Sequence, residues 1–404
     1  AELGYSNAMN RLGHCYENGK GVTQNFEKAI EYYQKAAELG YVIATENLGD
    51  KYVHGRGVAQ NYSIAVEHYQ QTIKPGNSST LGKLGICYEY GNGVKQNYTK
   101  AAEYYMREAE HRNSYALNKL GIFYESGKGV KKNYNKSADC FQQAATLGNS
   151  FAMYNLGLCY ENGYGVDQDY VKAVEYYQQA AKFKNSDALN SLGLCYEYGK
   201  GVEKNYVKAV DYYQQSAKLK NSDAMNNLGL CYEYGKGVKQ SYYKAVDYYQ
   251  QSTKLLNPNA MYNLGNCYEN GNGVHQNYSM AVDYYQQSSR LGNSNSMHKL
   301  GLCYESGKGV RQNYTAALEY YQQSSNLGNS NSMHRLGLCY ENGRGVEQNY
   351  TKAAQYYHQS SELGNSNAKY NLGLCYEYEK GVLKNYSMAA KYYKESADLG
   401  NSDS

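Results

Sequence analysis

The feature that most constrains the fold is a repeat of 36 residues that runs through the chain. A Leu-Gly pair returns at this interval from Leu12 to Leu372, with no insertion or deletion between. Self-similarity at a fixed period of this length is typical of a solenoid, in which each unit buries its apolar face only against its neighbours. The period divides the chain into eleven units: 5–40, 41–76, 77–112, 113–148, 149–184, 185–220, 221–256, 257–292, 293–328, 329–364 and 365–400.

The residue pattern within each unit predicts two helices. In the seventh unit Ala224, Leu228 and Cys231 fall at i, i+4 and i+7, which places them on one apolar face of a first helix. Gly235 follows that helix and is suited to the left-handed conformation that ends it. A second helix is expected from Tyr242 to about Leu255. The predicted fold is therefore all-α, an α-α superhelix of about 22 helices.

Bulk composition argues against two classes of partner. The chain carries 41 Lys and Arg against 37 Asp and Glu, a net charge of +4, and a dedicated nucleic-acid binder is usually more basic. No apolar run reaches the roughly 18 residues that a membrane span needs. We expect one solenoid over residues 1–404 that is a segment of a longer chain, because Ala1 matches the end of a repeat and Ser404 falls near the start of another.

The conserved frame of each unit reads A-x-x-x-L-G-x-x-Y-x-x-G-x-G-V-x-x-(N/D)-Y-x-K-A-x-x-Y-Y. Over residues 5–400 this pattern resembles the Sel-1-like repeat family, which is related to the tetratricopeptide repeats. The chain departs from the family in having Tyr where Trp is frequent in the second helix, as at Tyr32 and Tyr104, and Glu379 in place of a loop Gly. The resemblance implies a right-handed superhelix that acts as a scaffold or adaptor between proteins.

The cysteines predict buried thiols and no enzyme chemistry. Nine of the ten occupy one repeat position, and equivalent positions in stacked helices lie about 8–10 Å apart, too far for a disulfide. All ten are expected to be reduced and buried, which favours a cytoplasmic location. The sequence contains no C-x-x-C, H-E-x-x-H or G-x-S-x-G motif, and its G-x-G-V loops follow helices as caps do. We expect no catalytic residue, no metal and no cofactor; cysteine-rich relatives have been linked to weak hydrolase activity, but this chain lacks their paired cysteines.

Eight N-glycosylation sequons keep the secretory pathway or the endoplasmic reticulum lumen as the alternative location. Their asparagines are Asn61, Asn77, Asn97, Asn135, Asn277, Asn313, Asn349 and Asn385.

A glutamate follows the tyrosine of the first helix in most units, as Glu233 follows Tyr232. Its recurrence indicates a structural or solvated role rather than acid–base catalysis, with Lys208 or Lys244 of the second helix as the expected partners.

The informative residues vary while the frame stays fixed. Two positions before the Leu, the last four units present Tyr262, His298, His334 and Tyr370, and Lys299 and Arg335 stand beside the histidines. Aromatic and arginine side chains are frequent in binding hot spots, so this row is the candidate partner-binding site, with a merely exposed stripe as the alternative. We expect an acidic or mixed peptide to bind it in the groove of residues 257–400, more tightly near pH 6 than pH 8 through protonated imidazoles.

Two positions after the Leu stands a second row, of leucines, whose exposed or core placement the sequence leaves open. It comprises Leu158, Leu194, Leu230, Leu302, Leu338 and Leu374. The expected function is a non-enzymatic protein-binding scaffold with a protein or peptide partner; the structural alternative is a spacer or filament component formed by end-to-end self-association of the array.

Overall fold

The computed structural model describes residues 2–73 and 79–400, and this part of the chain contains 22 α-helices and no strand. The helices pair into eleven repeats, which confirms the all-α prediction. No helix among the described residues is long and apolar enough to cross a membrane. In the first half of the chain the helices are α1 Glu2–Asn18, α2 Phe26–Glu38, α3 Val42–His54, α4 Tyr62–Gln71, α5 Ser79–Tyr90, α6 Tyr98–Ala109, α7 Ser114–Ser126, α8 Tyr134–Thr146, α9 Ser150–Asn162, α10 Tyr170–Lys182 and α11 Ser186–Tyr198. In the second half they are α12 Tyr206–Lys218, α13 Ser222–Tyr234, α14 Tyr242–Thr253, α15 Pro258–Asn270, α16 Tyr278–Arg290, α17 Ser294–Ser306, α18 Tyr314–Asn326, α19 Ser330–Asn342, α20 Tyr350–Glu362, α21 Ser366–Tyr378 and α22 Tyr386–Asp398.

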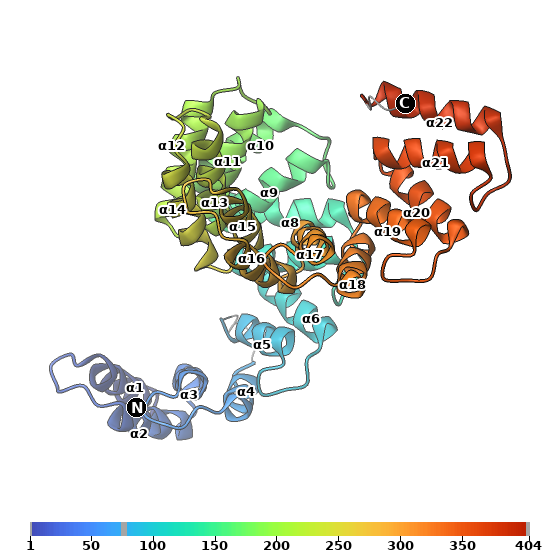
Figure 1. Cartoon of the computed structure of the whole chain (residues 1–404). Coiled ribbons are helices and arrows are strands. Elements are labelled where there is room, and N and C mark those ends of the chain that lie inside the picture. The colour runs from blue at the N-terminus through green and yellow to red at the C-terminus, as the bar shows by residue number, and fades with distance from the viewer. Residues whose placement is uncertain (1, 74–78, 401–404) are drawn as a thin grey trace. The chain divides into compact units, whose positions relative to one another are not determined.

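Two compact units make up the chain, residues 1–204 and residues 205–404. Within the second unit, α12 to α22 follow one another along a curved path, with α13, α15 and α17 toward its inner side (Figure 1). All the residues of the predicted partner-binding row belong to this second unit.

The helix ends follow from local sequence. The side chain of Asn277 accepts a hydrogen bond from the backbone N–H of Met280 and so caps the start of α16. Gly235 ends α13 in the left-handed region at φ 69°, as its sequence position predicts. In the last repeat Glu379 adopts the same conformation at φ 58°, so the exchange of the loop Gly leaves the cap geometry intact.

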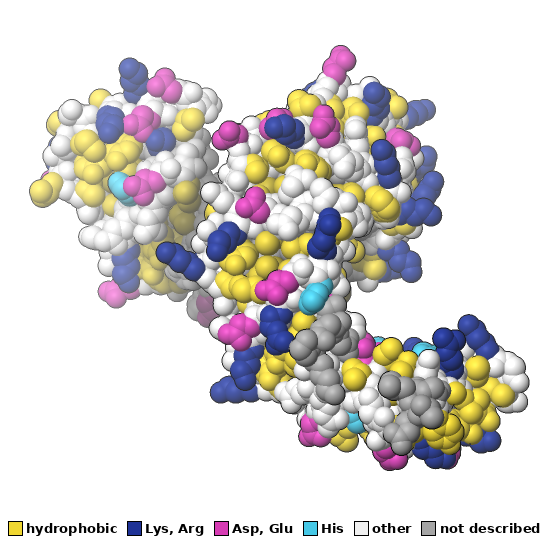
Figure 2. Space-filling model, turned by 180° about the vertical axis from the view of Figure 1, so that it is seen from behind, with side chains coloured by type: hydrophobic (Ala, Val, Ile, Leu, Met, Phe, Trp, Pro, Cys, Tyr) yellow, Lys and Arg dark blue, Asp and Glu magenta, His cyan; other side chains and the backbone are white. Residues whose placement is uncertain are grey.

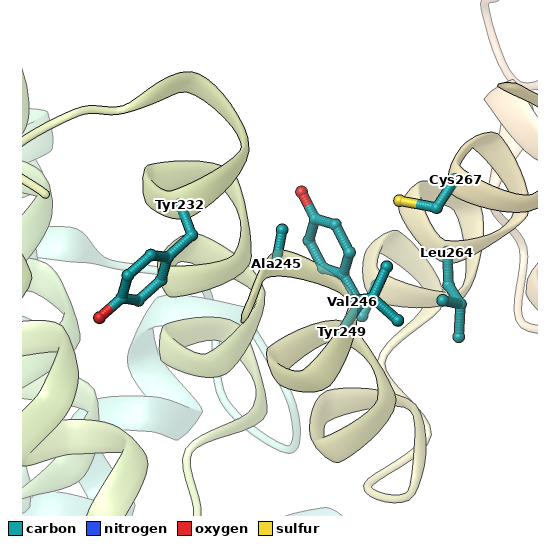
Figure 3. Close-up of a cluster of buried hydrophobic side chains, with 7 residues drawn as sticks. Tyr232, Ala245, Val246, Tyr249, Leu264 and Cys267 are labelled. Atoms are coloured by element: carbon teal, nitrogen blue, oxygen red, sulfur yellow. The ribbon is translucent and has the colours of Figure 1, made fainter. Parts of the chain in front are cut away.

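The core continues from one repeat into the next. Figure 3 shows one buried cluster, in which Tyr232 comes from α13, Val246 and Tyr249 from α14, and Leu264 and Cys267 from α15. Tyr249, Leu264 and Cys267 are at most 1% exposed. Because α15 begins the following repeat, each unit buries part of its apolar surface only when its neighbour is present.

A glycine in the first helix lets the two helices of a repeat touch. A Cβ atom on Gly229 would overlap the ring of Tyr249 in the second helix, and one on Gly265 would lie 2.5 Å from Cε1 of Tyr285. The same contact recurs along the array, from Gly13 with Tyr33 to Gly373 with Tyr393, and the ring is Phe141 in the fourth repeat. The glycine therefore recurs because the aromatic ring occupies the space of its missing side chain.

We predict that Gly229→Leu destabilises the array by about 1–3 kcal/mol, because the new side chain forces the ring of Tyr249 or the helix to move. Thermal and urea unfolding followed by circular dichroism measure the change. Ser279→Leu, at an exposed position of α16, is the control and should leave the transition nearly unchanged. A Gly229→Leu protein that unfolds like the parent would contradict the contact.

One second helix buries a carboxyl group. Glu108 in α6 is 3% exposed, at the position where later repeats have the serines Ser252 and Ser288. Its Oε1 accepts a hydrogen bond from Nδ2 of Asn113 at 3.0 Å, and its Oε2 has no partner among the described residues. Burial raises the pKa of Glu108 from 4.5 to about 7.

Glu108→Ser should therefore remove a pH dependence of stability. The folded pKa of Glu108 lies above the unfolded one, so its protonated form stabilises the fold below about pH 4.5, and this contribution is lost as pH rises toward about 7. Above pH 7 the variant should be more stable than the parent by up to about 3 kcal/mol. Urea unfolding at pH 5 and pH 8 measures it, with Ser252→Ala as the control. An equal difference between variant and parent at both pH values would contradict the assignment.

Candidate functional site

The predicted row lies on the first helices of the last four repeats, half-buried against the second helices. Each ring packs at a tilt on a tyrosine of its own repeat. The centroid distances are 6.0 Å for Tyr262–Tyr285, 5.8 Å for His298–Tyr321, 5.8 Å for His334–Tyr357 and 5.6 Å for Tyr370–Tyr393. The structure therefore brings the four residues onto equivalent places of consecutive repeats, where one side of each ring is covered.

Polar atoms of this row also join neighbouring repeats. Nδ1 of His298 lies 2.8 Å from Oγ of Ser332, and Nε2 of His334 accepts a hydrogen bond from Nδ2 of Asn371 at 3.0 Å. In an earlier repeat Asn226 takes the place of histidine and accepts from Nδ2 of Asn263 at 2.9 Å. His298, His334 and Asn226 at this repeat position thus link one repeat to the next.

The pKa values of the two histidines give no support to the tighter binding expected near pH 6. Burial, followed by the positive charge of Arg335, lowers the pKa of His298 to about 4, and the same two causes lower the pKa of His334 to about 4. Both imidazoles are therefore neutral at pH 6 and at pH 8. The sequence suggested exposed imidazoles, but the packing of each ring on a buried tyrosine removes water from it.

The glutamates of the first helices accept hydrogen bonds from tyrosines of the second helices. The hydroxyl of Tyr321 donates to Oε2 of Glu305 at 2.6 Å, and the partner lies 16 residues away in sequence. Eight such pairs have distances of 2.5 to 2.7 Å. Nζ of Lys244, one of the two expected partners of the glutamates, instead lies over the ring of Tyr232, 5.1 Å from its centroid.

Cations of the following repeat complete these sites. Nζ of Lys299 lies 2.9 Å from Glu269, while Nη1 of Arg335 and Nη1 of Arg344 lie 3.7 and 3.2 Å from Glu305. Burial opposes ionisation of Glu269, but the hydroxyl of Tyr285 and the ammonium of Lys299 bring its pKa below the usual 4.5. Lys299 and Arg335 are therefore partly engaged within the array, not wholly free for a partner.

A pocket of about 410 Å³ opens beside these charges. Its lining comprises Glu269, Leu302, Cys303, Glu305, Ser306, Lys308, Tyr314, Arg335 and Arg344. Sequence reasoning found Arg335 but missed Lys308 and Arg344, since the middle residue of each G-x-G loop was interpreted only as part of a cap. The sequence contains no separate signal for these two residues, because most units carry Lys or Arg at this loop position and Asn272 of the eighth unit is one of the exceptions.

The leucine row, which the sequence left open, lies on the same helix face as the aromatic row. His298 and Leu302 are four residues apart in α17, one helical turn, and both are half-buried. Leu230, Leu302 and Leu338 pack on the edges of buried clusters. The row is thus partly core and partly surface, and it continues the aromatic row along the first helices.

The surface around these rows is mixed in character. On the face shown in Figure 2, hydrophobic, cationic and anionic side chains are interspersed. Among the described residues no group of three or more His, Cys, Asp or Glu side chains is placed to hold a metal ion. The seven described sequon asparagines are exposed, whereas Asn77 lies outside the described residues.

All ten cysteines are free thiols, and nine of them are buried. Cys15 is the exception to the prediction and is half-buried, because no helix precedes α1 in the described chain to cover that face. Burial raises the pKa of Cys303 to about 11 and that of Cys267 to about 12, so neither thiol is a reactive nucleophile near neutral pH.

The comparisons with known proteins agree on one family. The sequence model of the Sel1 repeat matches eleven segments: 6–41, 42–74, 81–107, 114–149, 150–182, 186–221, 222–255, 258–293, 294–329, 330–365 and 366–401. Among solved structures, a protective antigen of uropathogenic Escherichia coli with an SLR fold is 28% identical, with a TM-score of 0.69 over 98% of this chain and 85% of that one. A Sel1 repeat protein from Oxalobacter formigenes is 29% identical, with a TM-score of 0.55 over 60% of this chain and 96% of that one. A search of curated proteins finds no match.

Thiol titration should separate Cys15 from the other cysteines. We expect one thiol to react quickly with a chromogenic disulfide in the folded protein and all ten to react after denaturation, because the other nine are buried. Cys15→Ser should remove the fast phase, and Cys267→Ser, the matched control, should preserve it. Several fast thiols in the native parent would contradict the burial of the remaining cysteines.

Proposed function

Because the chain belongs to the Sel1 repeat family, whose members are generally protein-interaction scaffolds and typically non-catalytic, we propose that it binds a peptide or helix of a protein partner. The partner lies along the first helices of the last four repeats, α15, α17, α19 and α21. Its contacts are with Tyr262, His298, Lys299, His334, Arg335 and Tyr370.

The observation that carries this proposal is the half-buried face on which His298 and Leu302 lie one turn apart. The ring of His298 packs on Tyr321, and the other rings of the row pack on the equivalent residues. Because this packing already orders the rings, they offer contact area to a partner without a further loss of side-chain entropy on binding. The pocket of about 410 Å³ next to Leu302 gives the face the concavity that an anchor side chain needs.

Asparagine exchanges provide the sharpest test, because the array already has Asn190 and Asn226 at the same repeat position. The purified array and a variant with Tyr262, His298, His334 and Tyr370 all changed to Asn are used to capture proteins from the source cell. A partner that the parent retains should bind the variant at least tenfold more weakly, which corresponds to about 1.4 kcal/mol. The pKa values of the two imidazoles are about 4, so their protonation does not change between pH 6 and pH 8. The two histidines should therefore cause no difference in the affinity of the parent for its partner between these pH values.

The control variant carries Gln287→Asn, Gln323→Asn and Gln359→Asn, which alter exposed positions of the second helices α16, α18 and α20. It should bind like the parent. Equal retention of the partner by the row variant would place the interface elsewhere, and concentration-dependent elongation of the purified array with no retained partner would favour the spacer function.

A further inference from the structure

Two consecutive repeats carry a pair of cations that the preceding repeat lacks. In the ninth unit Lys299 precedes the Leu and Lys308 is the middle residue of the G-x-G loop. In the tenth unit the same positions are Arg335 and Arg344. In the eighth unit both positions are asparagines, Asn263 and Asn272, on the same backbone frame.

Three of these four cations pair with two carboxylates of the preceding repeats. Lys299 pairs with Glu269 at 2.9 Å, and Arg335 and Arg344 both reach Glu305, at 3.7 and 3.2 Å. Each carboxylate also accepts a tyrosine hydroxyl. The pocket is lined by three cations, Lys308, Arg335 and Arg344, and by the carboxylates of Glu269 and Glu305, which leaves an excess of one positive charge.

The excess charge faces solvent. The side chains of Arg335 and Arg344 are 39% and 52% exposed, whereas that of Glu305 is 15% exposed beneath them. Both guanidinium groups line the pocket of about 410 Å³, together with Lys308 and the apolar side chains of Leu302 and Tyr314. The pocket therefore combines donors for an anion with walls for a hydrocarbon stem.

We propose that this pocket binds a glutamate or aspartate side chain of an acidic peptide segment in the partner. The inference rests on the proposed function and specifies the chemistry that the scaffold recognises. A guanidinium group presents two parallel N–H donors to a carboxylate, and charge-assisted bonds of this kind are about twice as strong as neutral ones. The pocket favours a peptide over a nucleic acid because Arg335 and Arg344 meet at the single carboxylate of Glu305 instead of following a backbone, and because the whole chain has a net charge of only +4.

Fluorescence anisotropy with a labelled peptide of alternating Glu and Leu measures the interaction, with the matching Gln–Leu peptide and an oligouridylate as comparison probes. The parent should bind the Glu–Leu peptide at least tenfold more tightly than either comparison probe. Arg335→Asn with Arg344→Asn should lower the affinity for that peptide at least tenfold. The exchange reproduces the surroundings of Glu233, whose repeat neighbours are Asn263 and Asn272, so the fold is expected to persist and is checked by thermal unfolding.

Arg290→Asn with Arg311→Asn removes the same charge at sites that do not line the pocket and should leave the affinity unchanged. Arg335→Lys with Arg344→Lys keeps the charge and should retain part of the binding even if the asparagine variant is unstable. Equal affinity of the parent and the asparagine variant, or equal affinity for the Glu and Gln peptides, would overturn the inference, as would tighter binding of the oligouridylate. If the partner captured from cells still depends on Tyr262 and Tyr370 in those cases, the scaffold function stands and only the assignment of the pocket fails.

Discussion

The contact between a glycine of the first helix and an aromatic ring of the second is the interaction on which the other features depend. The ring of Tyr249 occupies the place where a side chain on Gly229 would lie, so the two helices approach more closely than side chains would otherwise allow. A glycine inside a helix costs about 1 kcal/mol relative to alanine. The burial of a complete tyrosine ring at 0% exposure offsets that cost, since burying a large side chain contributes about 1.5–3 kcal/mol.

The same tyrosine also fixes the charges of the array. A fully buried ring still has a hydroxyl that needs a partner, and the hydroxyl of Tyr249 finds it in Glu233 at 2.5 Å. Where the fourth repeat has Phe141 instead, that donor is lost, and burial raises the pKa of Glu125 above its usual value. In the second repeat Val53 replaces the glutamate, and Tyr69 donates to Asp50, one turn earlier, at 2.7 Å. The hydroxyl is thus satisfied by whichever carboxylate the first helix can supply.

The 36-residue period was sufficient to predict the helices and their glycine caps, because both follow from spacing within one unit. The pairing of Tyr321 with Glu305 was not predictable in this way, since both residues are invariant in most units and their directions depend on how two helices cross. The low pKa of His298 depends on its burial between the second helix of the same repeat and the first helix of the next repeat. The local sequence pattern does not indicate how deeply the imidazole is buried there. The aromatic row was therefore found correctly as a set of equivalent positions, but its exposure was overestimated, and its role as a binding surface stays a proposal.

The loops explain how such an array can acquire a charge pattern without losing its frame. In the eighth repeat Gly271 and Gly273 adopt φ values of 76° and 71°, which residues other than glycine rarely tolerate. The residue between such glycines is asparagine at position 272 and arginine at position 344, with the same backbone on either side. Because the backbone conformation is the same with either residue, the position between the two glycines can vary without a change in the loop. Within one short loop, the positions that hold the frame of the solenoid are therefore separate from the position at which its surface charge varies.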